Sequence, residues 1–304
     1  MVEAHRGANY EQQLRMAQAA ERLGFAAFTR TEHYTPTDGS LGEPGPTDAW
    51  LTLAAIARET TAIRLGTLMT CTTFRYPTVL AVMVAQADQM SNGRVELGVG
   101  AGWFEGEHHV MGVPFPQIPE RIDRFEEQLA ILRGLWALDG GDRFSFDGKY
   151  FKVEDNPGLP RPVQAGGPPI VIGGKGVRRL PRLAVQYAAE FNSSNCDLDN
   201  VSQRYGRVIA ACEKYGRDRE SIKFSHAIVV CCGRTDREIA RRLEITGQDL
   251  DKFNVVNIAG SPEYAIERIK AFADLGTQRM YLQLLDMDDI DHAELIANAV
   301  LPHV

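Results

Sequence analysis

Short apolar runs alternate with amphipathic segments along almost the whole chain. The segment 10–23 carries apolar residues three positions apart from Leu14 to Leu23, a spacing that predicts a helix. The run at 169–174 is short and almost entirely apolar, which is typical of a strand buried on both faces. Parallel strands need long crossover connections, so this alternation predicts parallel strands joined by helices.

The same pattern assigns the remaining elements. Strands are expected at residues 25–30, 63–70, 95–99, 169–174, 190–194, 222–232 and 279–285. Further helices are expected after an N-cap at Thr47 and at 77–90, 120–138, 176–189, 200–215, 236–247, 262–275 and 290–300. An eighth strand fits only at residues 1–4 and is expected to be short or truncated. We therefore predict an α/β fold, a (β/α)8 TIM barrel with insertion segments, in one domain of residues 1–304.

Two segments depart from the simple alternation. Residues 143–151 alternate and contain an Asp-Gly turn, so we expect a small hairpin inserted into the barrel. A long loop is expected after residue 99, where Gly98, Gly100 and Gly102 precede Trp103. A flat ligand can approach the backbone at such glycines. A dinucleotide fingerprint would need G-x-G-x-x-G leading into a helix, so a Rossmann fold is not indicated.

Composition narrows the function classes. The chain has 304 residues, 44% hydrophobic residues and a net charge of −7. That charge argues against a broad surface for nucleic acid or an anionic membrane. No apolar run reaches transmembrane length and no signal peptide is visible. The five cysteines form no C-x-x-C motif, so we expect buried, reduced thiols in a cytoplasmic protein.

A series of short motifs occurs in order along the chain. They are Leu23-Gly-Phe25, Thr31-Glu-His33, Ile63–Thr67 with Phe74–Pro77, Arg94–His108, Ile172–Gly174, Tyr281–Leu285 and Leu301-Pro-His303. Taken together, they resemble the bacterial-luciferase-like superfamily of flavin and deazaflavin oxidoreductases, and most closely its actinobacterial, coenzyme F420-dependent branch. The resemblance implies hydride transfer between C5 of F420 and a small organic substrate. An FMN-dependent two-component monooxygenase and a non-catalytic flavin-binding barrel are the alternatives.

The resemblance also implies a cofactor site. Its residues are His33, Leu68, Met69, Thr70, Cys71, Gly100, Ala101, Gly102, Trp103, Gly173, Gly174, Lys175, Ser193 and Ser194. In the family, a non-proline cis peptide supports the ring, and Leu68–Met69 is the matching pair. Free N–H groups at a helix N-terminus bind phosphate, which suits the glycines before Lys175. Arg178 and Arg179 add positive charge for an acidic cofactor tail, although a tight turn with solvated basic residues explains them equally well.

Catalytic roles are assigned to His33 and Glu32. Imidazole exchanges protons near neutral pH, so His33 can relay the proton that accompanies hydride transfer. F420-dependent glucose-6-phosphate dehydrogenases have a glutamate where this chain has Trp103, and a lysine beyond the position of Ser194 that is missing here. A sugar phosphate is therefore not the expected substrate. Four aromatic residues are expected instead to line an apolar or aromatic-walled pocket, unless they simply belong to the core. They are Trp50, Phe74, Trp103 and Phe104.

The remaining expectations concern metals and assembly. His108 and His109 are adjacent and lack the spacing of a metal site, so both are interpreted as loop or surface residues and no metal is expected. Relatives usually form dimers, so we expect a homodimer in which the helix at 79–90 contributes to the contact.

Overall fold

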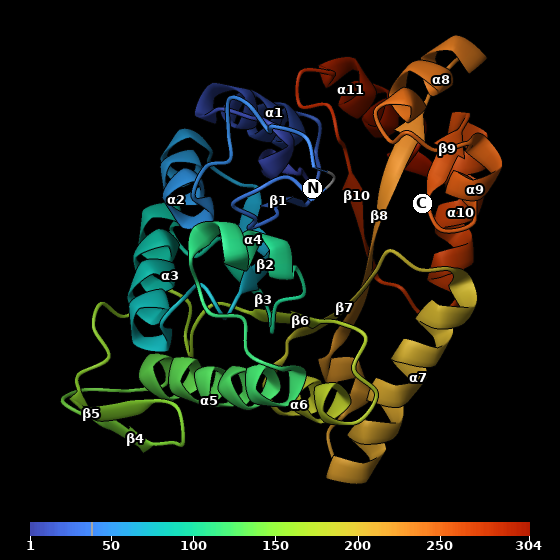
Figure 1. Cartoon of the computed structure of the whole chain (residues 1–304). Helices are drawn as coiled ribbons and strands as arrows, with labels where there is room; N and C mark the ends of the chain where they lie inside the picture. The colour runs from blue at the N-terminus through green and yellow to red at the C-terminus, as the bar shows by residue number, and fades with distance from the viewer. Residues whose placement is uncertain (38) are drawn as a thin grey trace. The chain divides into compact units, whose positions relative to one another are not determined.

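The computed structural model describes residues 1–37 and 39–304 (Figure 1). The chain divides into two compact units, which are described one at a time. Unit 1 comprises residues 1–3, 11–28 and 172–304, and unit 2 comprises residues 4–10 and 29–171. Strands β1 (Ala27–Arg30) and β6 (Ile170–Gly173) each begin in one unit and end in the other.

Unit 2 is built on parallel strands with helices packed beside them. Strand β2 (Arg64–Cys71) pairs in parallel with β3 (Val95–Gly100), and the helix that joins them is α3 (Pro77–Ser91). Helix α3 packs between α2 (Ala49–Glu59) and α5 (Ile118–Trp136), as Figure 1 shows. A short helix α4 (Glu105–Met111) follows β3. The strand–helix order is the one expected from the hydrophobic pattern.

The start of α2 differs from the expected one. Asp48, not Thr47, is the N-cap, since its carboxylate accepts the N–H of Leu51 at 2.9 Å. The hydroxyl of Thr47 is occupied elsewhere, because it accepts a hydrogen bond from the buried guanidinium of Arg30 at 2.8 Å. The helix itself stands where it was expected.

The predicted hairpin is present and longer than expected. Strands β4 (Phe144–Asp147) and β5 (Lys152–Asn156) pair in antiparallel fashion. The carboxylate of Glu127 on α5 accepts the backbone N–H groups of the turn residues 149–151 at 2.8 to 3.0 Å. Beyond the hairpin, the buried carboxylate of Asp88 on α3 accepts the N–H groups of residues 163 and 164 at 2.8 and 3.0 Å. Two helix carboxylates therefore hold the insertion.

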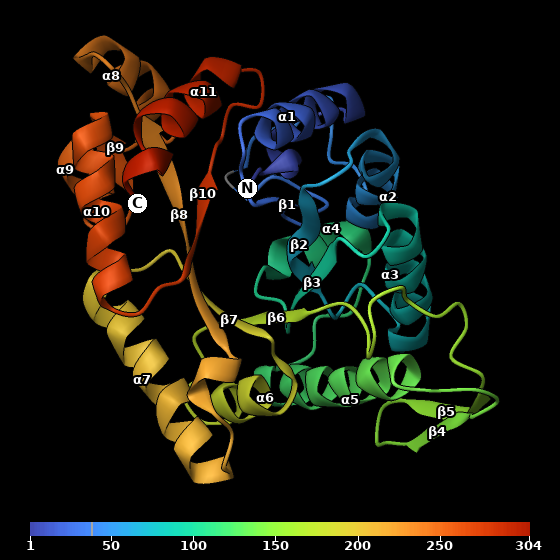
Figure 2. The same cartoon turned by 180° about the vertical axis from the view of Figure 1, so that it is seen from behind.

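Unit 1 is also a parallel sheet with helices beside it. Strands β7 (Glu190–Ser194) and β10 (Arg279–Gln283) pair on either side of β8 (Lys223–Cys232). The predicted short first strand is confirmed: Val2 forms a single parallel bridge with Leu284. The helices are α1 (Tyr10–Arg22), α6 (Arg179–Tyr187), α7 (Leu198–Tyr215), α8 (Asp236–Glu244), α9 (Leu250–Asn254), α10 (Pro262–Asp274) and α11 (Ile290–Ala299). Helix α10 packs against both β8 and α7 (Figure 2).

Several short elements were not expected from the sequence, among them two helices and a strand. Helices α4 and α9 have seven and five residues, and strand β9 (Ile258–Gly260), which pairs with β8, has three. Elements this short span too few positions for a hydrophobic period to be visible. Helix α6 also begins three residues later than expected, at Arg179.

Two expectations from the sequence concern the cysteines and membrane-spanning segments. All five cysteines are free and buried, as expected: Cys71, Cys196, Cys212, Cys231 and Cys232. Within residues 1–37 and 39–304, no helix has the length and apolar character needed to cross a membrane.

Candidate active site

The end of β2 has an irregular backbone. The peptide bond between Leu68 and Met69 is cis, as the resemblance implied. The pairing of β2 with β3 shifts register at the same place, between Thr67 and Thr70. A Cβ at Gly100 on β3 would meet only the sulfur of Met69, at an ordinary 3.7 Å. The expected ring-binding residues of these two strands therefore lie together in unit 2.

The glycines of β3 serve different purposes. A Cβ on Gly98 would lie 2.0 Å from the carbonyl oxygen of Thr67, so the neighbouring strand, not a ligand, requires this glycine. The expectation that a ligand approaches the backbone at Gly98 is therefore wrong. Gly102 has φ of +80°, and a Cβ there would lie 2.6 Å from the sulfur of Cys71. Arg121 holds this turn from α5 by donating to the carbonyl of Gly102.

His33, which follows β1, is paired with a carboxylate that the sequence analysis did not identify. Its Nδ1 lies 3.0 Å from Oε1 of Glu107 on α4. The other oxygen of Glu107 accepts the backbone N–H of Tyr34 at 3.1 Å. The side chain of His33 is 14% exposed and that of Glu107 only 1%. Both oxygens of this buried carboxylate are therefore bound to the segment that carries His33.

Aromatic rings surround His33. The ring of His5 lies edge-on at 4.9 Å between centroids, and those of Trp103 and Phe104 at 5.7 and 6.3 Å. Trp103 stacks on Phe104 at 5.3 Å, and 67% of its surface is exposed. The structure thus brings the rings of His33, Trp103 and Phe104 together.

Glu32 lies in a buried cluster of charges. Nε of Arg75 donates to Oε1 of Glu32 at 2.9 Å, and Nη2 of Arg75 also contacts Glu32 and Asp48. The hydroxyl of Tyr34 donates to Asp48 at 3.0 Å. Burial raises the pKa of Glu32, and the charge of Arg75 opposes this rise. Burial also favours a higher pKa for Asp48. Hydrogen bonds from the Leu51 N–H and from Arg75 outweigh this effect and leave the pKa of Asp48 lowered.

The other two aromatic candidates are Trp50 and Phe74. Trp50 is almost fully buried, and its indole N–H donates to the hydroxyl of Thr70 at 2.9 Å. Phe74 lies between the rings of Tyr34 and His108, with centroids 5.1 and 4.2 Å away. Trp50 is therefore a core residue that supports the end of β2, whereas Phe74 is only half-buried.

His108 is buried, so its interpretation as a loop or surface residue is wrong. Its Nδ1 donates to the carbonyl of Phe104 at 2.7 Å, and its Nε2 lies 2.6 Å from the hydroxyl of Thr73. Because Nδ1 carries the proton, Thr73 donates to Nε2, and the thiol of Cys71 lies 2.8 Å from the same hydroxyl. Burial raises the pKa of Cys71 to about 11, so its thiol stays protonated. His109 is exposed, as expected.

In unit 1, the loop after β6 leads directly into α6. Gly174 has φ of +144°, and a Cβ there would lie 3.1 Å from the side chain of Leu180. Lys175 is exposed, and no side chain caps the N-terminus of α6. The uncapped N-terminus of α6 and the exposed Lys175 thus present backbone donors and a cation, which is the chemistry of an anion site.

The end of β7 adds hydroxyl groups and an arginine. Arg204 on α7 donates to the hydroxyl of Ser193 at 3.3 Å and to the carbonyl of Ser194 at 3.1 Å. Burial raises the pKa of the Cys196 thiol, and the charges of Arg204 and Lys175 oppose that rise. Lys175 therefore acts electrostatically on the end of β7. Arg204 was missed because nothing in a polar helix marks one arginine as inward-facing.

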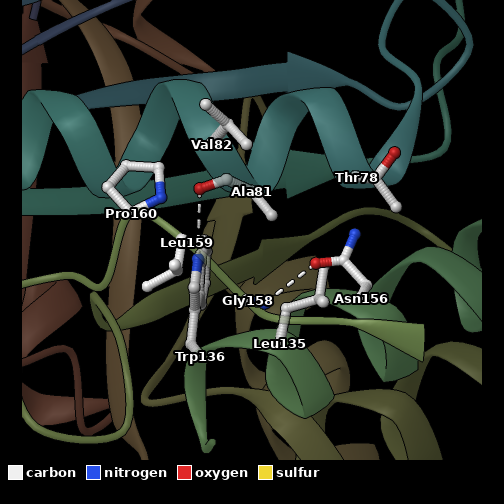
Figure 3. Close-up of a pocket in the computed structure, with 9 residues that line it drawn as sticks. All are labelled: Thr78, Ala81, Val82, Leu135, Trp136, Asn156, Gly158, Leu159 and Pro160. Atoms are coloured by element: carbon white, nitrogen blue, oxygen red, sulfur yellow. Dashed lines mark hydrogen bonds between the residues drawn. The ribbon is translucent and has the colours of Figure 1, made fainter. Parts of the chain in front are cut away.

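A separate pocket lies among the helices of unit 2 (Figure 3). It is bordered by Ala81 on α3, Trp136 on α5 and the segment 156–160, and the indole of Trp136 donates to the carbonyl of Ala81 at 3.2 Å. It contains none of the expected site residues. The residues that the structure describes include no cluster of three or more His, Cys, Asp or Glu side chains able to hold a metal ion.

Candidate functional groups lie at the carboxyl ends of strands in each unit: the cis peptide in β2 and His33 after β1 in unit 2, and Lys175 after β6 in unit 1. That placement is typical of α/β-barrel enzymes. Residues 2–254 match the family described as luciferase-like monooxygenase, and the chain belongs to this family.

Similar proteins support both the family and the fold. The chain is 30% identical, over 86% of its length and 71% of the relative, to an F420-dependent hydroxymycolic acid dehydrogenase of Mycobacterium tuberculosis. It is 35% identical to an F420-dependent glucose-6-phosphate dehydrogenase of Amycolatopsis mediterranei, over 86% and 84% of the two chains. A solved F420-dependent secondary alcohol dehydrogenase matches with a TM-score of 0.83 and 20% identity, covering 99% and 98% of the two chains. The predicted TIM-barrel fold is therefore confirmed.

Proposed function

We propose that this chain is an F420-dependent oxidoreductase that acts on a small organic substrate. The observation that carries the proposal is the bare backbone of Gly100 beside Met69, in the same unit as His33 and its aromatic neighbours. The F420-dependent relatives support this choice of cofactor. When bound, the deazaflavin supplies a carbon, C5, that accepts or returns a hydride.

The residues at the ends of β2 and β3 fit a flat ring. Gly100 has no side chain, and a Cβ there would make only an ordinary contact with Met69, so the backbone is accessible. Leu68, Thr70, Cys71, Ala101 and Gly102 complete the set of residues that would hold the ring.

The loop after β6 fits the phosphate and the acidic tail. The uncapped N–H groups of α6 and the glycines before Lys175 would bind a phosphate, and the hydroxyl groups of Ser193 and Ser194 would assist. Lys175 is exposed and would attract the negatively charged tail.

We further propose that the substrate is an apolar or aromatic alcohol or carbonyl compound, not a sugar phosphate. Trp103 presents an exposed ring beside His33, where the sugar-phosphate enzymes carry a carboxylate. Asn195 follows Ser194, so the lysine that contacts sugar phosphate in those enzymes is missing. In alcohol oxidation, His33 would accept the proton of the substrate hydroxyl group. The hydride would leave the carbon that bears this hydroxyl group, and C5 of the deazaflavin would accept it.

Titration of the purified protein with F420 and with FMN, followed by fluorescence quenching, tests the cofactor. We expect tighter binding of F420, and loss of its absorbance when a suitable secondary or aromatic alcohol is added. Glucose 6-phosphate should give no turnover. Tighter binding of FMN, together with substrate-dependent oxygen uptake from its reduced form, would instead support the monooxygenase alternative that the family description also covers.

We also propose a cytoplasmic homodimer. Its five cysteines are buried and free, which suits a reducing compartment. Large apolar side chains are exposed on adjacent helices of unit 2, namely Leu51 on α2 with Val79 and Val82 on α3. An exposed apolar patch of this kind is typical of a protein–protein contact.

A further inference from the structure

We propose that Glu107 is a positioning residue that fixes the protonation pattern of the His33 ring, an inference that rests on the proposed function. The two residues are 74 positions apart in sequence and are joined through Oε1 of Glu107 and Nδ1 of His33 at 3.0 Å. No other carboxylate contacts His33 among residues 1–37 and 39–304.

The hydrogen bonds that Glu107 accepts determine which ring nitrogen of His33 carries the proton. An ionised carboxylate can only accept hydrogen bonds, and Oε2 of Glu107 already accepts the N–H of Tyr34 at 3.1 Å. Oε1 must therefore accept from His33, so neutral His33 carries its proton on Nδ1. This leaves the lone pair on Nε2, the nitrogen that would receive a proton from a substrate hydroxyl.

The surroundings keep the ring from turning away. Tyr34 and His33 are consecutive, so one carboxylate holds both the backbone and the ring of this loop. The rings of His5 and Trp103 pack edge-on against His33. Nε2 of His33 is not enclosed, and in the described residues it makes no hydrogen bond of its own. It is therefore available to a substrate.

Glu107→Gln is the informative change, because it keeps the shape and alters the pattern of donors. The amide oxygen can still accept the N–H of Tyr34, but the amide nitrogen then faces Nδ1 and can only donate. This stabilises the tautomer with the proton on Nε2, in which His33 cannot accept the substrate proton there. In a serine protease, the equivalent carboxylate-to-amide change behind a histidine lowers turnover by about 10⁴-fold.

Long-range ¹H–¹⁵N NMR of the cofactor-free protein, labelled at histidine, measures the tautomer directly. The signal of His33 is assigned by its disappearance in His33→Gln. We expect the Nδ1–H tautomer in the wild type and in Glu107→Asp, and a shift toward the Nε2–H tautomer in Glu107→Gln. Glu105→Gln is the matched control, because Glu105 is an exposed carboxylate of the same helix. A wild-type Nε2–H tautomer, or one unaffected by Glu107→Gln, would overturn the proposal.

Turnover provides the second readout. With F420 bound, Glu107→Gln should lower the single-turnover rate by about 10²–10⁴-fold while the Kd for the cofactor changes less than about threefold. Equal loss of rate in Glu105→Gln, or a loss explained by cofactor affinity alone, would count against a positioning role. If wild type showed the Nδ1–H tautomer but bound no F420, the proposed function would fail and the assignment of the tautomer would stand.

Discussion

Arg75→Met should destabilise the protein strongly, because the buried carboxylate of Glu32 loses the guanidinium that is hydrogen-bonded to it. The side chain of Glu32 is 1% exposed and that of Arg75 is 12% exposed, so water cannot replace the lost guanidinium. Breaking a buried ion pair by removing one partner costs about 3–5 kcal/mol. Asp48, the second acidic partner, is 29% exposed and can be hydrated, so it adds little to this cost. We expect the free energy of unfolding to fall by about 3–5 kcal/mol near neutral pH.

The loss should depend on pH in a defined direction. Burial already raises the pKa of Glu32 above its ordinary value of 4.5, and removal of Arg75 raises it further. A carboxyl group with a raised pKa binds its proton more tightly in the folded state, so stability falls as pH rises above the unfolded value. Arg75→Met should therefore be less destabilised at about pH 5 than at about pH 8. Because the pKa of Asp48 is lowered, its protonation affects the free energy of unfolding only at pH values below this range.

Urea denaturation followed by circular dichroism measures these differences. Glu32→Gln combined with Arg75→Met should be more stable than Arg75→Met alone, because the buried charge is then removed. Arg143→Met is the control, since Arg143 forms an exposed ion pair with Asp155 and should cost at most about 1 kcal/mol. A loss below about 1 kcal/mol in Arg75→Met, or no recovery in the double variant, would refute the argument.

Three further outcomes are expected. His33→Ala should lower the single-turnover rate roughly 10²–10⁴-fold with a smaller change in cofactor Kd; unchanged rate and affinity in stopped-flow and titration would remove it from the site. Lys175→Glu should weaken binding of polyglutamylated F420, more at low salt, as measured by fluorescence titration; salt-independent binding would contradict a charge-based role. Light scattering at micromolar concentration should give the mass of a homodimer, and Val79→Asp on α3 should lower it toward that of a monomer.

The strands and long helices could be predicted because each repeats its hydrophobic pattern over several turns or alternations. The boundaries depended on single hydrogen bonds that the sequence does not reveal. Thr47 and Asp48 are both good N-caps, and the structure has Asp48 as the cap while the hydroxyl of Thr47 accepts from the Arg30 guanidinium. Adjacent His108 and His109 look equivalent in sequence, but α4 turns about 100° per residue and places one inward and one outward.

The parts of the site in which a motif determines the backbone conformation could be predicted. Contacts between side chains that are distant in the sequence could not. The cis peptide at Leu68–Met69 was implied by family resemblance and is present. The partner of His33 could not be deduced, because four glutamates, Glu32, Glu96, Glu105 and Glu107, occur in the same two motifs. Which of them reaches the imidazole depends on the orientation of α4, since Glu105 faces outward and Glu32 is held by Arg75.

The hairpin insertion is fastened at two separate points, and this has a consequence for how the family can diversify. Glu127 holds the turn of the hairpin, whereas Asp88 holds the chain where it returns toward β6. Because Asp88, together with Gln89 of the same helix, fixes the return, a change in chain length between the two anchors leaves the register of β6 unchanged. Natural or engineered variation in length can therefore accumulate in residues 152–160, between the two anchors, without disturbing the catalytic scaffold.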